Sequence, residues 1–102
     1  MIAMEIILKT LKFDADQKLV EFVNKKVGRL KRFFPAGGEQ AAEVTLSLGI
    51  NPDNKEVKIQ IHFPGQDLII ERQSHSFEQA ITDGVDAMKE KMTRAKEKLY
   101  DK

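Results

Sequence analysis

The stretch that decides the fold is VTLSLGINPDNKEVKIQIHFPGQDLIIERQ, residues 44–73. Apolar side chains occupy alternate positions in each of its three segments, which is the pattern of strands with one buried face. The segments are residues 44–50, 57–63 and 68–73, joined by turns at residues 51–54 and 64–67 that contain Pro, Gly, Asn and Asp. Turns this short predict three consecutive antiparallel strands.

Upstream of this stretch, the sequence predicts one further strand and a helix. Residues 1–8 alternate between apolar and polar positions, which indicates a strand. An apolar stripe of helical period follows over residues 19–34. Asp14 is the expected N-cap of this helix, with Gln17 returning a hydrogen bond as in a capping box. Pro35 is expected to end the helix.

Downstream, the sequence predicts a second helix that runs nearly to the C-terminus. Ser76 and Gln79 form its expected capping box. Its apolar positions step by three or four residues: Phe77, Ile81, Val85, Met88, Met92, Ala95 and Leu99. Met88 and Met92 lie in this seam, so we interpret them as core residues and not as a partner-binding groove.

The predicted element order is β-α-β-β-β-α. A right-handed crossover makes the first strand parallel to the second, and the other two strands follow as a meander. Each strand has one strongly apolar face, so both helices are expected on that side, with Lys58, Gln60 and His62 on the open face. The fold class is therefore α+β, a two-layer sandwich of a four-stranded sheet and two helices.

Length and composition predict a single domain over residues 1–102 in the cytoplasm. The sequence contains no cysteine, and nothing in it resembles a signal peptide or a membrane helix. His62 and His75 have no carboxylate at ligand spacing, so no metal site is expected. Gly37-Gly38-Glu39 differs by one residue from the Gly-Gly-Gln of peptide-release enzymes and lacks its glutamine. We therefore expect no enzymatic activity, no cofactor and no small-molecule substrate.

The basic residues, Lys and Arg, indicate the function better than the histidines and glycines do. The net charge is only +1, but residues 18–32 hold six bases and one acid, and residues 88–102 hold six bases and three acids. On helical geometry the bases of each helix lie beside its apolar seam. Lys18, Lys25, Arg29 and Arg32 form one stripe on the first helix; Lys91, Arg94, Lys98 and Lys102 form one flank of the second helix, and Lys89 and Lys96 lie on its other flank.

Charge alone leaves three interpretations of the helix surfaces open. Facing basic flanks on adjacent helices would form a ridge for phosphates and would suit folded RNA. Alternatively, Lys and Arg often lie beside a core seam as ordinary solvated residues. A third alternative is a protein-interaction module that uses the edge of the fourth strand or the methionine-containing helix.

Several segments together resemble the ribosome hibernation promoting factor and ribosome-associated inhibitor family, also called the sigma-54 modulation protein family. The resemblance covers essentially the whole chain. It rests on Phe13-Asp14-Ala15-Asp16 followed by Leu19, Phe22, Val23, Lys26, Val27, Arg29, Leu30, Phe33 and Phe34, on Pro64-Gly65, on Ser76-Phe77-Glu78-Gln79-Ala80-Ile81, and on Arg94-Ala95-Lys96-Glu97-Lys98.

The resemblance implies a fold like that of double-stranded-RNA-binding domains. It also implies binding to the rRNA of the small ribosomal subunit, in the channel of mRNA and tRNA, so that translation is silenced under stress or in stationary phase. The family's basic positions correspond here to Lys26, Arg29, Arg94, Lys96 and Lys98. Charge geometry adds Lys25, Lys89 and Lys91 as further rRNA-binding candidates.

The sequence departs from the family pattern in two respects. Relatives often carry a base at the positions of Ala87 and Glu90. The C-terminal ribosome-dimerisation domain of the long form is also expected to be absent.

Overall fold

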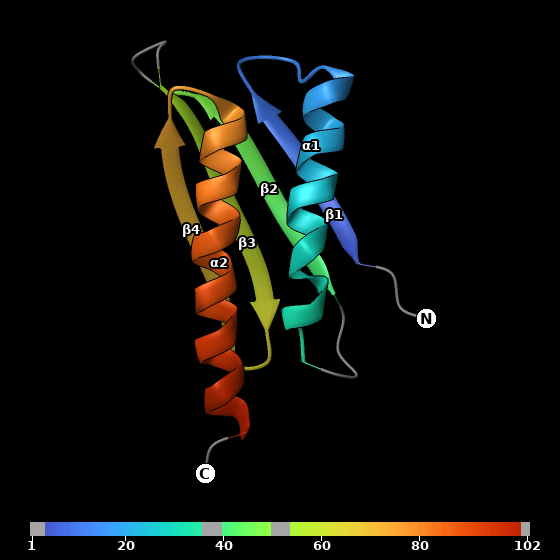
Figure 1. Ribbon diagram of the computed structural model, residues 1–102, viewed down its shortest axis with the longest axis vertical. Coiled ribbons are helices and arrows are strands. Elements are labelled where there is room, and N and C mark those ends of the chain that lie inside the picture. The colour runs from blue at the N-terminus through green and yellow to red at the C-terminus, as the bar shows by residue number, and fades with distance from the viewer. Residues whose placement is uncertain (1–3, 36–39, 50–53, 101–102) are drawn as a thin grey trace.

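The computed structural model describes residues 4–35, 40–49 and 54–100, and these residues form a sheet covered by two helices (Figure 1). The elements are β1 (Glu5–Leu11), α1 (Gln17–Gly28), the 3-10 helix η1 (Arg29–Phe33), β2 (Ala41–Leu48), β3 (Lys55–Phe63), β4 (Gln66–Ser74) and α2 (Phe77–Tyr100). The strand order is β1-β2-β3-β4, with β1 parallel to β2 and the other neighbours antiparallel. The predicted topology and fold class are confirmed.

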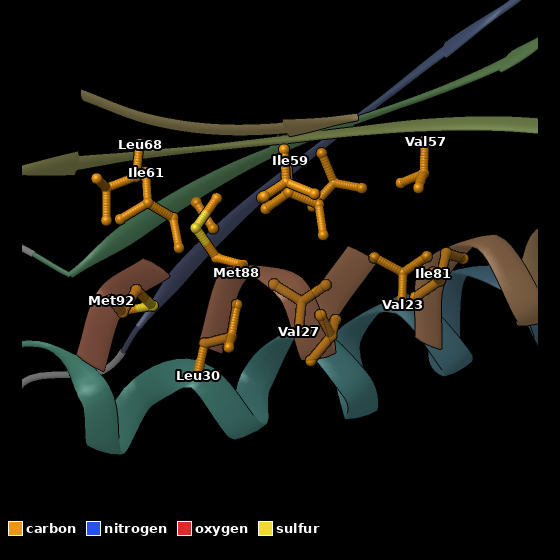
Figure 2. Close-up of a cluster of buried hydrophobic side chains, with 14 of the residues drawn as sticks. Val23, Val27, Leu30, Val57, Ile59, Ile61, Leu68, Ile81, Met88 and Met92 are labelled. Atoms are coloured by element: carbon orange, nitrogen blue, oxygen red, sulfur yellow. The ribbon is translucent and has the colours of Figure 1, made fainter. Parts of the chain in front are cut away.

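The core lies between the sheet and the helix layer. Figure 2 shows Val57, Ile59, Ile61 and Leu68 of the sheet facing side chains of both helices. The helices contribute Val23, Val27, Leu30, Ile81, Met88 and Met92, all of them fully or almost fully buried. The interpretation of both methionines as core residues is therefore confirmed. On the opposite face of the sheet, Lys58 and His62 are exposed and Gln60 is partly buried, as predicted.

Strand pairing moves several strand ends from their predicted positions. β1 continues to Leu11, beyond the predicted end at residue 8, because its parallel pairing with β2 runs from Glu5 to Leu11. The β3–β4 turn contains only Pro64 and Gly65, since Phe63 already pairs with Gln66. Gly65 has φ +82°, the left-handed conformation that a glycine adopts readily in such a turn.

The first helix is capped by a different aspartate from the predicted one. The Leu19 backbone N–H donates to Oδ1 of Asp16 at 2.8 Å, so Asp16 and not Asp14 is the N-cap of α1. The prediction of Asp14 with Gln17 is wrong, and the Gln17 side chain instead donates to Glu21. At α2, the Gln79 backbone N–H donates to Oγ of Ser76 at 3.1 Å, which confirms Ser76 as the predicted cap. The Gln79 side chain donates to Asp83 at 2.9 Å and not to Ser76, so the second half of the predicted capping box is wrong.

The first helix also changes its winding before it ends. α1 stops at Gly28 and continues as η1 to Phe33, whereas the sequence predicts one uninterrupted helix. Gly28 has weak helix propensity and Pro35 follows shortly afterwards, conditions under which a last turn often tightens into a 3-10 helix. This change determines where the last bases of the segment point.

Some predictions fall outside the described residues. They concern residues 1–3 of the first strand, Gly37-Gly38-Glu39, Ile50 of the second strand, most of the turn at residues 51–54, the side chain of Leu99, and Lys102. Within the part of the chain that the structure describes, no helix is long and apolar enough to cross a membrane.

Candidate nucleic-acid interface

A shallow groove of about 380 Å³ lies between the C-terminal half of the α1–η1 segment and the middle of α2. Its lining includes Leu30 and Val85, both buried, and Phe33, which is half-buried. The polar lining consists of Thr82, four basic residues and one acid: Lys26, Arg29, Arg32, Lys89 and Asp86. The groove therefore has an apolar base and a rim with an excess of positive charge.

The 3-10 winding of η1 keeps Arg32 on the side of the segment where Arg29 reaches the groove. Lys26, Arg29 and Arg32 are spaced by three residues. In an α-helix, each such step rotates a side chain by about 60° away from the previous one. In a 3-10 helix, side chains at i and i+3 are eclipsed, so Arg32 stays on the side of Arg29.

The basic residues that line the groove outnumber its one lining carboxylate, Asp86. Among the described residues, no salt bridge involves Lys26, Arg29, Arg32 or Lys89. The salt bridge found in the described residues joins His62 and Asp67, near the β3–β4 turn on the sheet. The bases around the groove thus remain available to a polyanion, and Arg29, Arg32 and Lys89 are exposed to solvent.

Three of the four basic residues that line the groove lie over aromatic rings. Nζ of Lys26 lies 5.6 Å from the centre of the Phe22 ring, and the guanidinium carbon of Arg32 lies 5.1 Å from that of Phe33. Lys89, on α2, places its Nζ 5.9 Å from the same Phe33 ring. These distances are those of cation–π contacts, which restrain a cation without cancelling its charge.

The predicted site residues separate into two groups in the structure. Lys26, Arg29 and Lys89 come together around the groove. Lys91 lies on the other side of α2, where its Nζ donates to the backbone oxygen of Ile69 in β4 at 2.8 Å. The remaining candidates are surface residues of α1 or of the last turns of α2 and do not line the groove: Lys25, Arg94, Lys96 and Lys98.

Arg32 is absent from the predicted site residues although it lines the groove. Its place in the basic stripe of the first helix was the available signal. The stripe by itself does not distinguish Arg32 from Lys18, which lies at the other end of α1 beside Phe13 and Phe77. Arg32 lines the groove and Lys18 does not, because of the winding of η1 and the position of α2.

Of the surfaces that would serve a protein-interaction module, the methionine seam is buried and the β4 edge is partly covered. Met88 and Met92 are fully buried and offer no contact surface. At the edge of the sheet, Lys91 donates to the Ile69 oxygen, and Arg72 donates to the neighbouring Glu71 oxygen at 2.7 Å. Cations on an edge strand discourage the pairing of a further strand.

The described residues contain no cluster of three or more metal-ligating side chains. Of the two histidines, His62 contacts Asp67 at 2.6 Å on the open face of the sheet, and His75 is exposed before α2. Neither lies at the groove, so the groove is the site on which the functional interpretation depends.

Comparison with known proteins connects this domain to a family. Residues 6–100 match the family described as Sigma 54 modulation protein / S30EA ribosomal protein. The chain therefore belongs to this family, and the resemblance seen in the sequence is confirmed. The family is one of ribosome-associated proteins. A search of curated proteins finds no match.

The solved structures that are similar to the domain include the following two. The crystal structure of the Protein Y N-terminal domain of Thermus thermophilus has 28% identity and a TM-score of 0.78, covering 90% of this chain and 99% of that chain. A ribosomal subunit interface protein from Coxiella burnetii has 19% identity and a TM-score of 0.75, covering 91% and 98%, respectively. The second likeness shows a shared fold alone.

Proposed function

We propose that this protein is a ribosome hibernation factor that binds rRNA of the small subunit with the groove between α1–η1 and α2. On this proposal it occupies the channel of mRNA and tRNA and silences translation under stress or in stationary phase. Membership of the sigma 54 modulation / S30EA family supports the ribosome as its target. The similarity to the Protein Y N-terminal domain, over nearly all of that chain, supports the proposal further.

The observation that carries the RNA part of the proposal is the excess charge of the groove. Four bases line it with a single carboxylate, and none of the four is in a salt bridge with a described residue. Phosphates of folded RNA suit such a surface, because A-form RNA is recognised largely through its backbone and shape. Arg29 and Arg32 add planar guanidinium groups that can bind phosphate through two hydrogen bonds.

The proposed mechanism is steric occupancy maintained by charge. Binding of phosphates releases condensed counterions, so affinity falls as the salt concentration rises. Four phosphate contacts correspond to a loss of affinity of about 10²-fold between 50 and 200 mM salt. The mechanism requires no chemical step, in line with the expectation that the protein is not an enzyme.

Sedimentation with purified bacterial ribosomes at two salt concentrations tests the proposal. The protein is expected to pellet with small subunits at low salt, to dissociate at higher salt, and to be displaced by mRNA with tRNA. Binding that competitors do not displace would place the protein outside the decoding channel. No co-sedimentation at low salt would refute ribosome binding altogether.

A further inference from the structure

Phe33 lies where the two cationic sides of the groove meet. Its ring is contacted by Arg32, from η1, with the guanidinium carbon at 5.1 Å, and by Lys89, from α2, with Nζ at 5.9 Å. We infer that Phe33 is a positioning residue whose ring orients these two cations toward the RNA backbone. The inference rests on the proposed function and names a residue that acts on RNA through its neighbours.

An aromatic ring suits this role better than a carboxylate does. The negative face of the ring attracts a cation, but the ring has no net charge, so the cation keeps its attraction for a phosphate. A carboxylate in the same place would restrain Arg32 and Lys89 equally well and would compete with the phosphate. In the groove, the aromatic ring contacts Arg32 and Lys89, and none of the basic residues that line it is in a salt bridge with a described residue.

The ring is itself held in place. Phe33 is half-buried and packs against the hydrophobic core. Leu30, which lines the same groove, is fully buried. A long cationic side chain loses rotamer freedom when it binds, and a fixed ring removes part of that loss in advance. Phe33 therefore lowers the entropic cost of binding for two bases that come from different helices.

The free protein provides the first test, which does not depend on RNA. Methylene protons of Arg32 and Lys89 are expected to show upfield ring-current shifts in NMR spectra. The Phe33→Leu variant keeps an apolar side chain and should lose these shifts, whereas Phe33→Tyr keeps the ring and should retain them. Phe13→Leu is the matched control: its half-buried ring stacks on Phe77, with centroids 4.6 Å apart.

The second test is the affinity of the same variants for purified small ribosomal subunits. Phe33→Leu should weaken binding roughly three- to tenfold, since two cation–π contacts of modest strength are lost. The slope of affinity against salt should stay as in the wild type, because the number of cations is unchanged. Phe33→Tyr should restore binding to within about twofold, and Phe13→Leu should bind like the wild type.

The possible outcomes distinguish the positioning role of Phe33 from the ribosome binding on which it rests. Failure of the wild type to bind would overturn both. A wild type that binds, together with a Phe33→Leu variant of equal affinity, would overturn the positioning role alone. The same conclusion would follow if Phe33→Tyr bound as weakly as Phe33→Leu, because Phe33 would then contribute packing only.

Discussion

Lys89 and Lys91 are two positions apart on α2, yet their ammonium groups have different neighbours. Lys89 lies over Phe33 at the groove, and Lys91 donates to the Ile69 oxygen at the edge of β4. Each lysine carries one positive charge. Substitution of one or the other therefore changes the net charge equally but removes the charge from a different place.

Lys89→Ala is expected to weaken binding to small ribosomal subunits by roughly three- to tenfold and to lower the salt slope by about one. Lys91→Ala removes the same charge away from the groove and should change affinity by less than about twofold at physiological salt. Binding assays across a salt series would measure both. Equal losses in the two variants would show that the groove is not the RNA site.

Asp16 and Asp14 form a second pair with different roles. Asp16 accepts the Leu19 N–H at the start of α1, whereas Asp14 is exposed in the preceding loop. Loss of an N-cap costs about 1 kcal/mol, so Asp16→Ala should lower the free energy of unfolding by that amount. Asp14→Ala should stay within about 0.5 kcal/mol of the wild type, as exposed substitutions usually do. Urea denaturation of both variants would test the assignment, and a larger loss for Asp14→Ala would reverse it.

At the scale of the element, α2 approaches β3 closely through Gly84. A Cβ atom at this position would lie 3.2 Å from Cδ1 of Ile59 and 3.3 Å from Cγ1 of Val57. Gly28, at the end of α1, is the contrasting case, since a Cβ there would meet nothing within 4 Å. The two glycines thus have opposite consequences: one permits close packing, and the other only weakens its helix.

Gly84→Val is expected to destabilise the domain by about 1–3 kcal/mol through overpacking against β3. Gly28→Ala should stabilise it by about 0.5–1 kcal/mol, because alanine loses less conformational entropy in a helix. Thermal unfolding monitored by circular dichroism would show the two shifts in opposite directions. A stabilised Gly84→Val variant would contradict the close approach of α2 to the sheet.

At the scale of the whole molecule, the two layers differ in charge. The groove carries its bases on the helix layer, whereas the open face of the sheet carries more acids than bases. The acids of that face are Glu5, Glu43, Glu56, Asp67 and Glu71, and its bases are Lys9 and Lys58. The net charge of +1 therefore conceals an uneven distribution of charge, with the basic excess of the helix layer on α1–η1. Such a distribution favours one orientation on a polyanion, with the helix layer facing it.

Neutralisation of the sheet face tests this orientation. The double variant Glu43→Gln with Glu71→Gln should bind small subunits within about twofold of the wild type at 0.15 M salt, where charges are screened over about 8 Å. At low salt its affinity should rise measurably, because long-range repulsion is reduced. A large loss of binding at either salt concentration would show that the sheet face contacts the ribosome.

The strands and the second helix were predictable because their signals are local. Alternation in residues 57–63 identifies a strand with one buried face, and Ser76 precedes α2 at capping distance. Local signals fail where two residues satisfy the same rule, as Asp14 and Asp16 do. They also fail where partner strands supply the hydrogen bonds, as in the extension of β1 to Leu11.

The sequence by itself determined the order of elements, the buried faces and the presence of basic side chains on both helices. Only the tertiary structure decided which flank of α2 faces the first helix. Lys89 faces it, and Lys91 faces β4. The tertiary structure also placed Arg32 at the groove, through the 3-10 winding of η1. The physical reason is that periodicity identifies a buried stripe on each helix, whereas the neighbours of its two margins depend on how the helices pack on the sheet.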